Sequence, residues 1–352
     1  MTKSLNNAGS FAEVPMQWVG PIAFRGPEVM GEVEVPLATY ESPLWPSVAR
    51  GAKVSVAGGG LSVVIADERM TRSVVVEASS VVEALAARDF ITKNRGTLES
   101  VTSTTSRYAK LKDVHTQIAG NLLFVRFAFD TGDASGHNMA TKAADALLGW
   151  ILDKCPELNY VSISGNYCCD KKPSAVNGIL GRGKYAVAEM VIDRKSCSRW
   201  LKTTPEKVAA LNVKKNLIGT MLAGGLRSAN AHFANMLLGF YLATGQDAAN
   251  IIEGSQGLTH AEAREAGLYF SVTIPNLIVG TAGNGKGLPF VVENLKRLGC
   301  LEPDRAPGTN ARRLAAIAAA TVWCGELSLL AAQTNPGELM KAHERLERAG
   351  NS

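Results

Sequence analysis

The pattern of hydrophobic residues changes once along the chain, and this change limits the folds that the chain can adopt. Residues 70–163 alternate short apolar runs of strand type with amphipathic stretches of helix type. After residue 173 the pattern becomes alanine-rich and helical, as in "NARRLAAIAAATVWCGELSLLAAQ". The 352 residues allow about two domains of ~100–200 residues each. We therefore predict an α+β protein in which a small α+β domain, residues 69–163, interrupts a large, mainly helical domain formed by 1–68 and 164–352.

Local signals place individual elements within residues 51–163. The runs "KVSVAGG", "LSVVIADE" and "RSVVVEA" predict strands. "SSVVEALAARDFITKN" predicts a helix that is capped by Ser79 or Ser80 and carries Glu83 in its first turn. "NLLFVRFAFDTGD" predicts a strand and a turn, "NMATKAADALLGWILDK" an amphipathic helix, and "LNYVSIS" another strand.

The composition limits the cellular compartment and the kinds of binding partner that we expect for this protein. The six cysteines are scattered without metal-knuckle spacing, and the first residues lack a secretory-signal pattern, so we expect reduced thiols in a cytoplasmic protein. The most apolar run, "FANMLLGFYLATG", is shorter than the ~20 residues that cross a bilayer, so we expect a protein that is not anchored in a membrane. The net charge of +5 is dispersed, so a polyanionic small molecule suits the chain and no nucleic-acid stripe is visible.

Residues 164–184, "SGNYCCDKKPSAVNGILGRGK", raise the possibility of a sulfur site, because they contain two adjacent cysteines. A disulfide between Cys168 and Cys169 is disfavoured, since consecutive α-carbons lie ~3.8 Å apart and disulfides span ~4.4–6.8 Å. A metal would need further ligands at suitable spacing, and none is near. Buried, inert cysteines are the simpler interpretation.

The same stretch also suits an anion site built on nitrogen. Pro173 fits the first turn of a helix through "PSAVNGIL", so Asp170, Lys171 and Lys172 would lie at its positive N-terminal end. A lysine held there can act as a fixed cation opposite a developing oxyanion. The alternative from this stretch alone is a pair of lysines on a solvated loop.

Several further motifs occur in order along the chain: "VPLATYE", "TSRYAKL", "GDASGHNM", "KKNLIGTMLAG", "NAHFANMLLGFYLATGQD", "GTAGNGKG" and "MKAHERLERA". Together with "SGNYCCDKKPSAVNGILGRGK" they resemble the 3-hydroxy-3-methylglutaryl-coenzyme A (HMG-CoA) reductase family over nearly the whole chain. "DKKP" and "ATGQD" are nearer the class I branch, shared by eukaryotes and archaea, than the typical bacterial branch. The resemblance implies reduction of HMG-CoA to mevalonate and coenzyme A by two NADPH, through mevaldehyde.

The resemblance also implies catalytic roles. Lys171 would polarise the carbonyl, Glu41 would supply a proton, Asp247 would link the two, and His343 would protonate the coenzyme A thiolate. Taken singly, each has an ordinary structural interpretation: Glu41 as a turn carboxylate, Asp247 as a helix cap and His343 as a surface histidine. Only the joint occurrence of the four residues supports a shared catalytic role.

The nicotinamide cofactor is implied to bind the small domain, in a ferredoxin-like and non-Rossmann manner. "GTAGNGKG" alone is a weak phosphate-loop signal, because it lacks the strand and helix frame and the ribose-binding acid of a Rossmann unit. The resemblance assigns Asp133 and Asn138 to the cofactor, with Gly283 closing over it. Ser106 and Arg107 match positions beside the extra phosphate of NADPH, which favours NADPH over NADH; an ordinary surface ion pair is the alternative for Arg107. No metal is implied.

Substrate contacts follow from the same resemblance. The matching residues are Ser164, Asn166, Asp170, Lys172, Lys215 and Asn235. Arg50 would face the coenzyme A phosphates, whereas His232 has either a site role or a buried structural one. Family members assemble their sites across a dimer interface, so we expect at least a homodimer.

The chain departs from the family pattern in a few places. Pro43, Trp45 and Pro46 in "ESPLWPS" crowd the segment behind Glu41. Further departures near the expected cofactor site are Ser135, His137, Asn284 and Lys286. They keep two rival functions open: a related acyl-CoA reductase with another substrate or an NAD-linked oxidative direction, and a non-catalytic coenzyme A or nucleotide sensor.

Overall fold

The structure is a computed structural model that describes residues 12–338 and 340. The strands are β1 (Met16–Arg25), β2 (Met30–Ala38), β3 (Ser62–Glu77), β4 (Lys110–Ala119), β5 (Leu122–Asp130), β6 (Asn159–Ser162), β7 (Gly183–Asp193), β8 (Leu258–Arg264) and β9 (Gly267–Leu277). The α-helices are α1 (Leu44–Ala57), α2 (Val81–Lys93), α3 (Arg95–Thr105), α4 (His137–Lys154), α5 (Ala175–Leu180), α6 (Arg194–Ser196), α7 (Pro205–Leu211), α8 (Thr220–Leu222), α9 (Phe233–Ala243), α10 (Ile251–Gly254), α11 (Pro289–Arg297) and α12 (Thr309–Gln333). The π-helical segments η2 (Cys197–Leu201) and η3 (Asn212–Gly219) and the 3-10 turn η4 (Ala248–Asn250) complete the set. The α+β class is confirmed.

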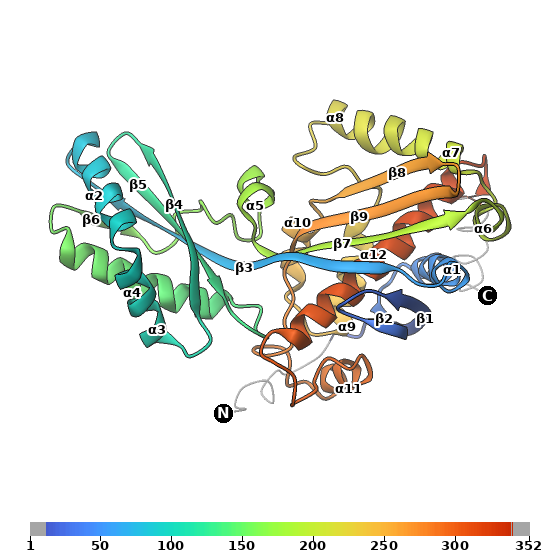
Figure 1. The fold of residues 1–352 in the computed structure, drawn as a ribbon, viewed down its shortest axis with the longest axis horizontal. Coiled ribbons are helices and arrows are strands. Elements are labelled where there is room, and N and C mark those ends of the chain that lie inside the picture. The colour runs from blue at the N-terminus through green and yellow to red at the C-terminus, as the bar shows by residue number, and fades with distance from the viewer. Residues whose placement is uncertain (1–11, 339, 341–352) are drawn as a thin grey trace.

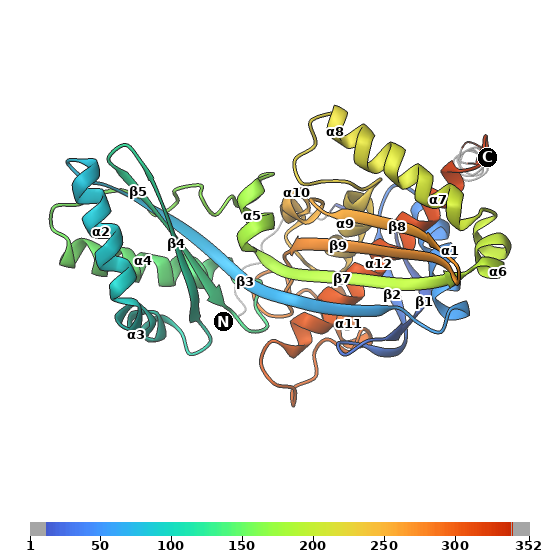
Figure 2. The same ribbon diagram turned by 45° about the horizontal axis from the view of Figure 1, so that its top comes forward.

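The strand β3 belongs to both halves of the molecule (Figures 1 and 2). Its first half, up to Arg69, pairs with β7, and its second half, from Met70 on, pairs with β5 and β6. The sheet order is β4-β5-β3-β7-β9-β8, with β6 on the other side of β3, and β1 and β2 form a separate hairpin. The domain boundary expected between residues 68 and 69 lies inside this strand, next to the change of partner.

Two hydrophobic cores form on either side of that point. The smaller core packs β3, β4 and β5 against α2, α3 and α4, around side chains such as Phe127 and Leu147. Ser80 caps α2 by accepting the backbone N–H of Glu83, and the Glu83 carboxylate accepts the N–H of Ser79 in return. Ser80 is one of the two caps that the sequence predicts, and Glu83 lies in the first turn as expected.

The larger core is built around α12, whose small residues let neighbouring helices approach closely. A side chain at Gly51 of α1 would collide with the backbone of Cys324, and one at Gly325 would collide with Met236 of α9. Long and apolar enough to cross a membrane, α12 is 94% buried over its most apolar window. It is therefore the central helix of this core.

Two expectations about local structure are wrong or incomplete. "KVSVAGG" does not form a strand but the C-terminal part of α1, which ends at Ala57, followed by a glycine turn. Between residues 183 and 277, where the alanine-rich pattern predicts a helical body, the chain also forms β7, β8 and β9. Together with the first half of β3, these three strands form the part of the sheet that belongs to the large core.

Candidate active site

The loop that carries Lys171 is held in an unusual backbone conformation. Asn166, Cys169 and Lys171 have φ values of 58°, 41° and 54°, in the left-handed region that side chains other than glycine seldom adopt. Specific bonds hold it: the N–H of Cys169 donates to the carbonyl of Asn166 at 3.0 Å, and the N–H of Lys171 donates to Oε1 of Glu253 at 3.1 Å. Such strain persists only where surrounding contacts over-determine it, and it is common at functional loops.

The helix after this loop is shorter than expected. It begins at Ala175 with Ser174 as its N-cap, so Pro173 lies one residue before the cap rather than in the first turn. Lys171 and Lys172 therefore precede a helix of six residues. The position of Lys171 depends on its side-chain partners more than on this helix.

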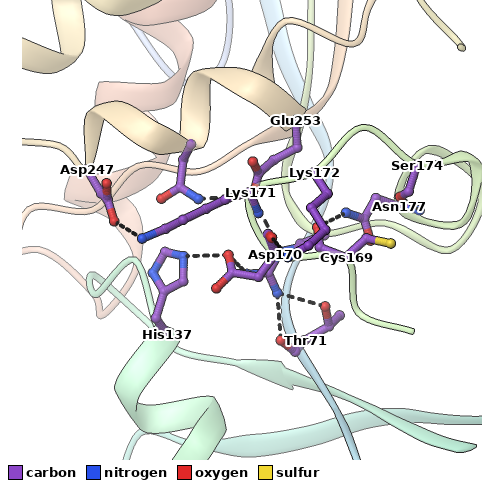
Figure 3. A network of polar contacts seen from close by, with 12 residues as sticks. Thr71, His137, Cys169, Asp170, Lys171, Lys172, Ser174, Asn177, Asp247 and Glu253 are labelled. Carbon is purple, nitrogen blue, oxygen red and sulfur yellow. Dashed lines mark hydrogen bonds and ion pairs between the residues drawn. The ribbon is translucent and has the colours of Figure 1, made fainter. Parts of the chain in front are cut away.

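Lys171 forms an ion pair with Asp247. Its Nζ lies 2.7 Å from Oδ2 of Asp247 (Figure 3). Oδ1 of Asp247 accepts the N–H of Ala249 at the start of η4. The bond to Asp247 raises the pKa of the Lys171 ammonium. Burial would raise the pKa of Asp247, but the hydrogen bond and charge of Lys171, together with the N–H of Ala249, outweigh burial and lower that pKa. Both groups are therefore charged at neutral pH.

A buried charge cluster supports the loop from behind. Arg182, only 1% exposed, donates to Oδ1 of Asp170 at 2.5 Å and to the carbonyl of Thr71 at 2.6 Å. Nε2 of His137 lies 3.5 Å from the same Asp170 oxygen (Figure 3). Burial would raise the pKa of Asp170, but the bond from His137 and the charge of Arg182 hold it well below its usual value. Asp170 is thus a fixed anion beside Lys171.

The cavity that contains Lys171 and Asp247 measures about 480 Å³. The described residues lining it include Asn138 and His137 at the start of α4, and Gly283, Asn284 and Lys286 from the glycine loop. Arg72 also lines it, and its buried Nε has no hydrogen-bond partner in the described part of the chain. Lys286 donates to the carbonyl of Gly245, and burial lowers its pKa to about 8. The cavity presents unmatched positive charge, which suits an anionic ligand.

Asp133 lies in an adjoining cavity of about 490 Å³, which shares Ala134, Met139 and Ala282 with the first. Its Oδ1 accepts the N–H of Ala311 at 2.9 Å, in the first turn of α12. Asp133 therefore caps the central helix of the large core, in addition to any contact with a ligand. No local sequence pattern predicts this hydrogen bond, because its two partners are 178 residues apart.

Ser106 and Arg107 lie beside this second cavity through their neighbour Tyr108, which lines it. The hydroxyl of Ser106 accepts the N–H of Tyr108 at 3.2 Å. The guanidinium of Arg107 is exposed and lies 4.6 Å from the centre of the Tyr108 ring. Among the described residues it forms no ion pair, so it is available to an anion.

Glu41 lies in a different cavity, of about 410 Å³, which also contains Arg50, His232 and Asn235. The side-chain amide of Asn235 donates to Oε2 of Glu41 at 2.6 Å. Within one chain the structure thus brings Lys171 and Asp247 together and places Glu41 in a separate cavity.

The crowded segment behind Glu41 is accommodated by the start of α1. Pro43 is the N-cap and Pro46 lies in the first turn, where a missing N–H leaves no helical bond unmade. Trp45 turns inward, donates its indole N–H to the carbonyl of Leu37 at 2.9 Å, and packs on the large core. The departures therefore leave the cavity open.

The remaining expected site residues are dispersed. Ser164, Asn166 and Lys172 belong to the Lys171 loop, and Lys172 donates to the carbonyl of Asp170 at 3.2 Å. Lys215 lies on η3, where burial lowers its pKa and its Nζ bonds to Asn216 at 3.2 Å. His343 lies outside the described residues.

Glu253 and Arg182 hold the Lys171 loop through hydrogen bonds, and sequence reasoning identified neither of them. Glu253 is fully buried, accepts the Lys171 N–H, and bonds to the side chain of Asn250 at 2.9 Å. Burial raises its pKa. A carboxylate in "IIEGS" and an arginine in "GRGK" give no local sign of such a role. Within residues 12–338 and 340, no cluster of three or more His, Cys, Asp or Glu could hold a metal ion.

The fold and the site together define an α+β protein of two fused cores, with a lysine–aspartate pair facing a cationic cavity. Residues 1–348 match the family model described as Hydroxymethylglutaryl-coenzyme A reductase. The chain is 41% identical to the 3-hydroxy-3-methylglutaryl-coenzyme A reductase of Pyrococcus abyssi, covering 98% of this chain and 85% of the relative. It is 42% identical to that of Aeropyrum pernix, covering 99% and 82%. The chain belongs to the HMG-CoA reductase family.

Further comparisons confirm the branch and the fold. Reductase 1 of Oryza sativa subsp. indica is 41% identical, covering 97% of this chain and 65% of that protein. A class II reductase from Streptococcus pneumoniae, solved with NADPH in open conformations, has a TM-score of 0.75 at 21% identity, covering 94% and 88%. The archaeal and eukaryotic relatives are closer in sequence than this class II enzyme, as expected for the class I branch.

Proposed function

We propose that this chain catalyses the NADPH-dependent, four-electron reduction of HMG-CoA to mevalonate and free coenzyme A. The observation that carries the proposal is the Lys171–Asp247 ion pair, with its 2.7 Å contact, in a cationic cavity of a family member. The direct test is loss of nicotinamide absorbance with purified protein, HMG-CoA and NADPH. No oxidation of either NADPH or NADH, with coenzyme A still bound, would favour the sensor instead.

The residues of the first cavity fit the chemistry of a dinucleotide. Arg72 and Lys286 offer positive charge, Asn138 and the start of α4 offer polar groups, and Gly283 leaves space above them. The nicotinamide supplies hydride when it is bound. Lys171 then holds the substrate carbonyl oxygen and stabilises the negative charge that develops there, first on the thioester and then on the aldehyde. Asp247 keeps Lys171 charged and oriented.

We propose that Glu41 reaches this chemistry from a second copy of the chain. Glu41 and Asn235 line one cavity and Lys171 lines another, so within one protomer the proposed proton donor and oxyanion holder face different cavities. A two-fold dimer that apposes the two cavities would complete two equal sites. His343 is assigned the protonation of the departing thiolate, on the resemblance alone.

Mixing two inactive variants tests this arrangement. If each site combines Glu41 of one protomer with Lys171 of the other, heterodimers of Glu41→Ala and Lys171→Ala contain one intact site. Random reassortment then restores about a quarter of the wild-type activity, because half the dimers are mixed and each has one working site. Activity that stays at the level of the single variants would mean that both residues serve within one protomer.

For the substrate, we propose that the glutaryl group is held by the loop and helix residues named from the sequence. Asp170 suits this role because Arg182 and His137 both engage its Oδ1, and the described residues leave its Oδ2 without a bond. The other proposed contacts are Ser164, Asn166, Lys172, Lys215 and Asn235. Arg50 is proposed to contact the coenzyme A phosphates.

We propose that residues 69–163 bind the dinucleotide and that NADPH is preferred to NADH. The exposed guanidinium of Arg107, beside Ser106 and above Tyr108, supports a contact with the extra phosphate. Asp133 and Asn138 are proposed to contact the dinucleotide as well. Replacing Arg107 by Met should lower kcat/KM for NADPH more than for NADH; an equal loss with both would remove the support for this preference.

The location is also a proposal. All six cysteines, Cys155, Cys168, Cys169, Cys197, Cys300 and Cys324, have free thiols in the structure. Free thiols suit a reducing compartment, so we propose a cytoplasmic homodimer that needs no metal.

A further inference from the structure

Arg50 is already occupied by partners from the same chain. Its Nε donates to the hydroxyl of Ser328 at 2.9 Å, and its Nη2 donates to the carbonyl of Ser328 at 2.5 Å. Its Nη1 lies 3.0 Å from Oε1 of Glu338. The Ser328 bonds fix the guanidinium against α12, and the third bond places a carboxylate at Nη1, where an anionic ligand would bind.

Glu338 lies in the turn after α12 and lines the same cavity as Arg50. The side-chain amide of Asn335 donates to its Oε2 at 3.2 Å, so both carboxylate oxygens are engaged. Arg50 and Glu338 are each about a quarter exposed, at 26% and 24%. The pair is therefore accessible from the cavity.

The charges in this cavity disfavour a phosphate while Arg50 and Glu338 remain paired. Glu41 and Glu338 are both acidic, and Arg50 is the one Lys or Arg among the described residues that line the cavity. An arginine fork binds carboxylate and phosphate in the same planar geometry. A phosphate that binds Nη1 of Arg50 therefore competes with the Glu338 carboxylate.

We propose that Glu338 is an internal competitor for Arg50, and that it sets the affinity of this cavity for the phosphate-bearing part of coenzyme A. This inference rests on the proposed contact between Arg50 and coenzyme A. On binding, Nη1 of Arg50 exchanges the Glu338 carboxylate for a phosphate oxygen, while the Ser328 bonds keep the guanidinium in place. Glu338 is thus a specificity-determining residue that opposes the ligand.

A purely structural role for the pair predicts the opposite sign. If the bond served only to fix the turn after α12, removing it would loosen the cavity and weaken binding. If Glu338 competes with phosphate, removing its charge strengthens binding, by about two- to fivefold for a partly exposed ion pair. The sign of the change separates the two roles.

The test is calorimetric titration of coenzyme A into wild type, Glu338→Gln, Arg50→Met and the double variant. We expect Glu338→Gln to bind coenzyme A about two- to fivefold more tightly, and the same change to have no effect when Arg50 is Met. Glu262→Gln is the matched control, since it removes the same charge at an exposed pair with Arg264 on β8. It should leave the affinity unchanged.

Two results would overturn the proposal and are distinguishable from each other. Equal or weaker binding by Glu338→Gln, with Arg50→Met weaker than wild type, would exclude competition but leave the coenzyme A contact standing. Binding that is unaffected by Arg50→Met, or absent from every variant, would remove the assigned contact on which the inference rests. Thermal unfolding of each variant checks that the fold is retained.

Discussion

The carboxylate of Glu326, in the middle of α12, lies 3.2 Å from Nδ1 of His232 at the start of α9. Glu326 is fully buried, and its two oxygens also accept the N–H groups of Ala231 and His232 and the hydroxyl of Thr259. With Nδ1 turned to Glu326, His232 has its Nε2 left for the cavity of Glu41. The buried Glu326 carboxylate therefore holds both the start of α9 and the His232 ring, which lines the proposed site.

Replacing Glu326 by Gln should destabilise the protein. An amide keeps the size of the side chain, but its NH₂ would face donors where only an acceptor fits. The expected loss is about 1–3 kcal/mol in the free energy of unfolding, measured by urea denaturation. Glu262→Gln on the surface serves as the control. A Glu326→Gln protein as stable as wild type would show that the buried bonds contribute little.

Replacing Lys171 by Ala should abolish most of the reductase activity without unfolding the chain. Removing a single donor to an oxyanion lowers kcat by about 10²–10³ in other enzymes. Lys171 is half exposed, so the loss of stability should be small. The control is Lys142→Ala on the exposed face of α4. Retention of full activity by Lys171→Ala would exclude the lysine from the chemistry.

The Asp133 bond to α12 predicts a loss of stability that is separate from any loss of cofactor binding. Asp133→Ala removes the acceptor at the helix start and should cost about 0.5–2 kcal/mol in the absence of ligand. Asp133→Asn keeps an oxygen there and should cost less. Urea denaturation without nicotinamide measures both. Equal stabilities for Asp133→Ala and wild type would mean that α12 needs no cap from this residue.

Lys286 should impose a pH dependence on stability. Its pKa is about 8 in the folded chain and near 10.5 when unfolded, so the unfolded chain binds more protons between these values. Stability should therefore rise with pH across this window, by up to about 1.4 kcal/mol per pH unit. Lys286→Met should be more stable than wild type at pH 7 and should lack this part of the rise. Urea denaturation at pH 7, 8, 9 and 10 tests it; parallel curves would contradict the burial of a charged Lys286.

The sequence predicts best where a signal is local and unambiguous. Ser80 and Glu83 lie within four residues of each other and cap α2 as expected. By contrast, β7 buries Ala186, Ala188, Met190 and Ile192 in strict alternation, yet alanine is a strong helix former and obscures the period. The error at "KVSVAGG" has a similar origin, because its valines suggest a strand while the buried face of α1 follows a helical spacing from Val48.

Site residues divide in the same way. Lys171 and Asp247 were recognisable because several motifs occur together, and the structure pairs their side chains. The roles of Glu253, Arg182 and Arg72 depend on contacts between distant segments, which no single motif encodes. The motifs themselves do not show that Glu41 and Lys171 line different cavities of one chain, although the expectation of a site at a dimer interface is consistent with it.

The continuous strand β3 limits how the molecule can move. Two domains that are joined by a flexible linker can swivel freely, but here the chain crosses from one core to the other inside a hydrogen-bonded ladder. Any rearrangement between the halves must therefore bend or twist the sheet itself, near Arg69 and Met70, where the pairing partner changes. When a ligand binds, we therefore expect small elastic displacements between the two halves rather than a hinged closure.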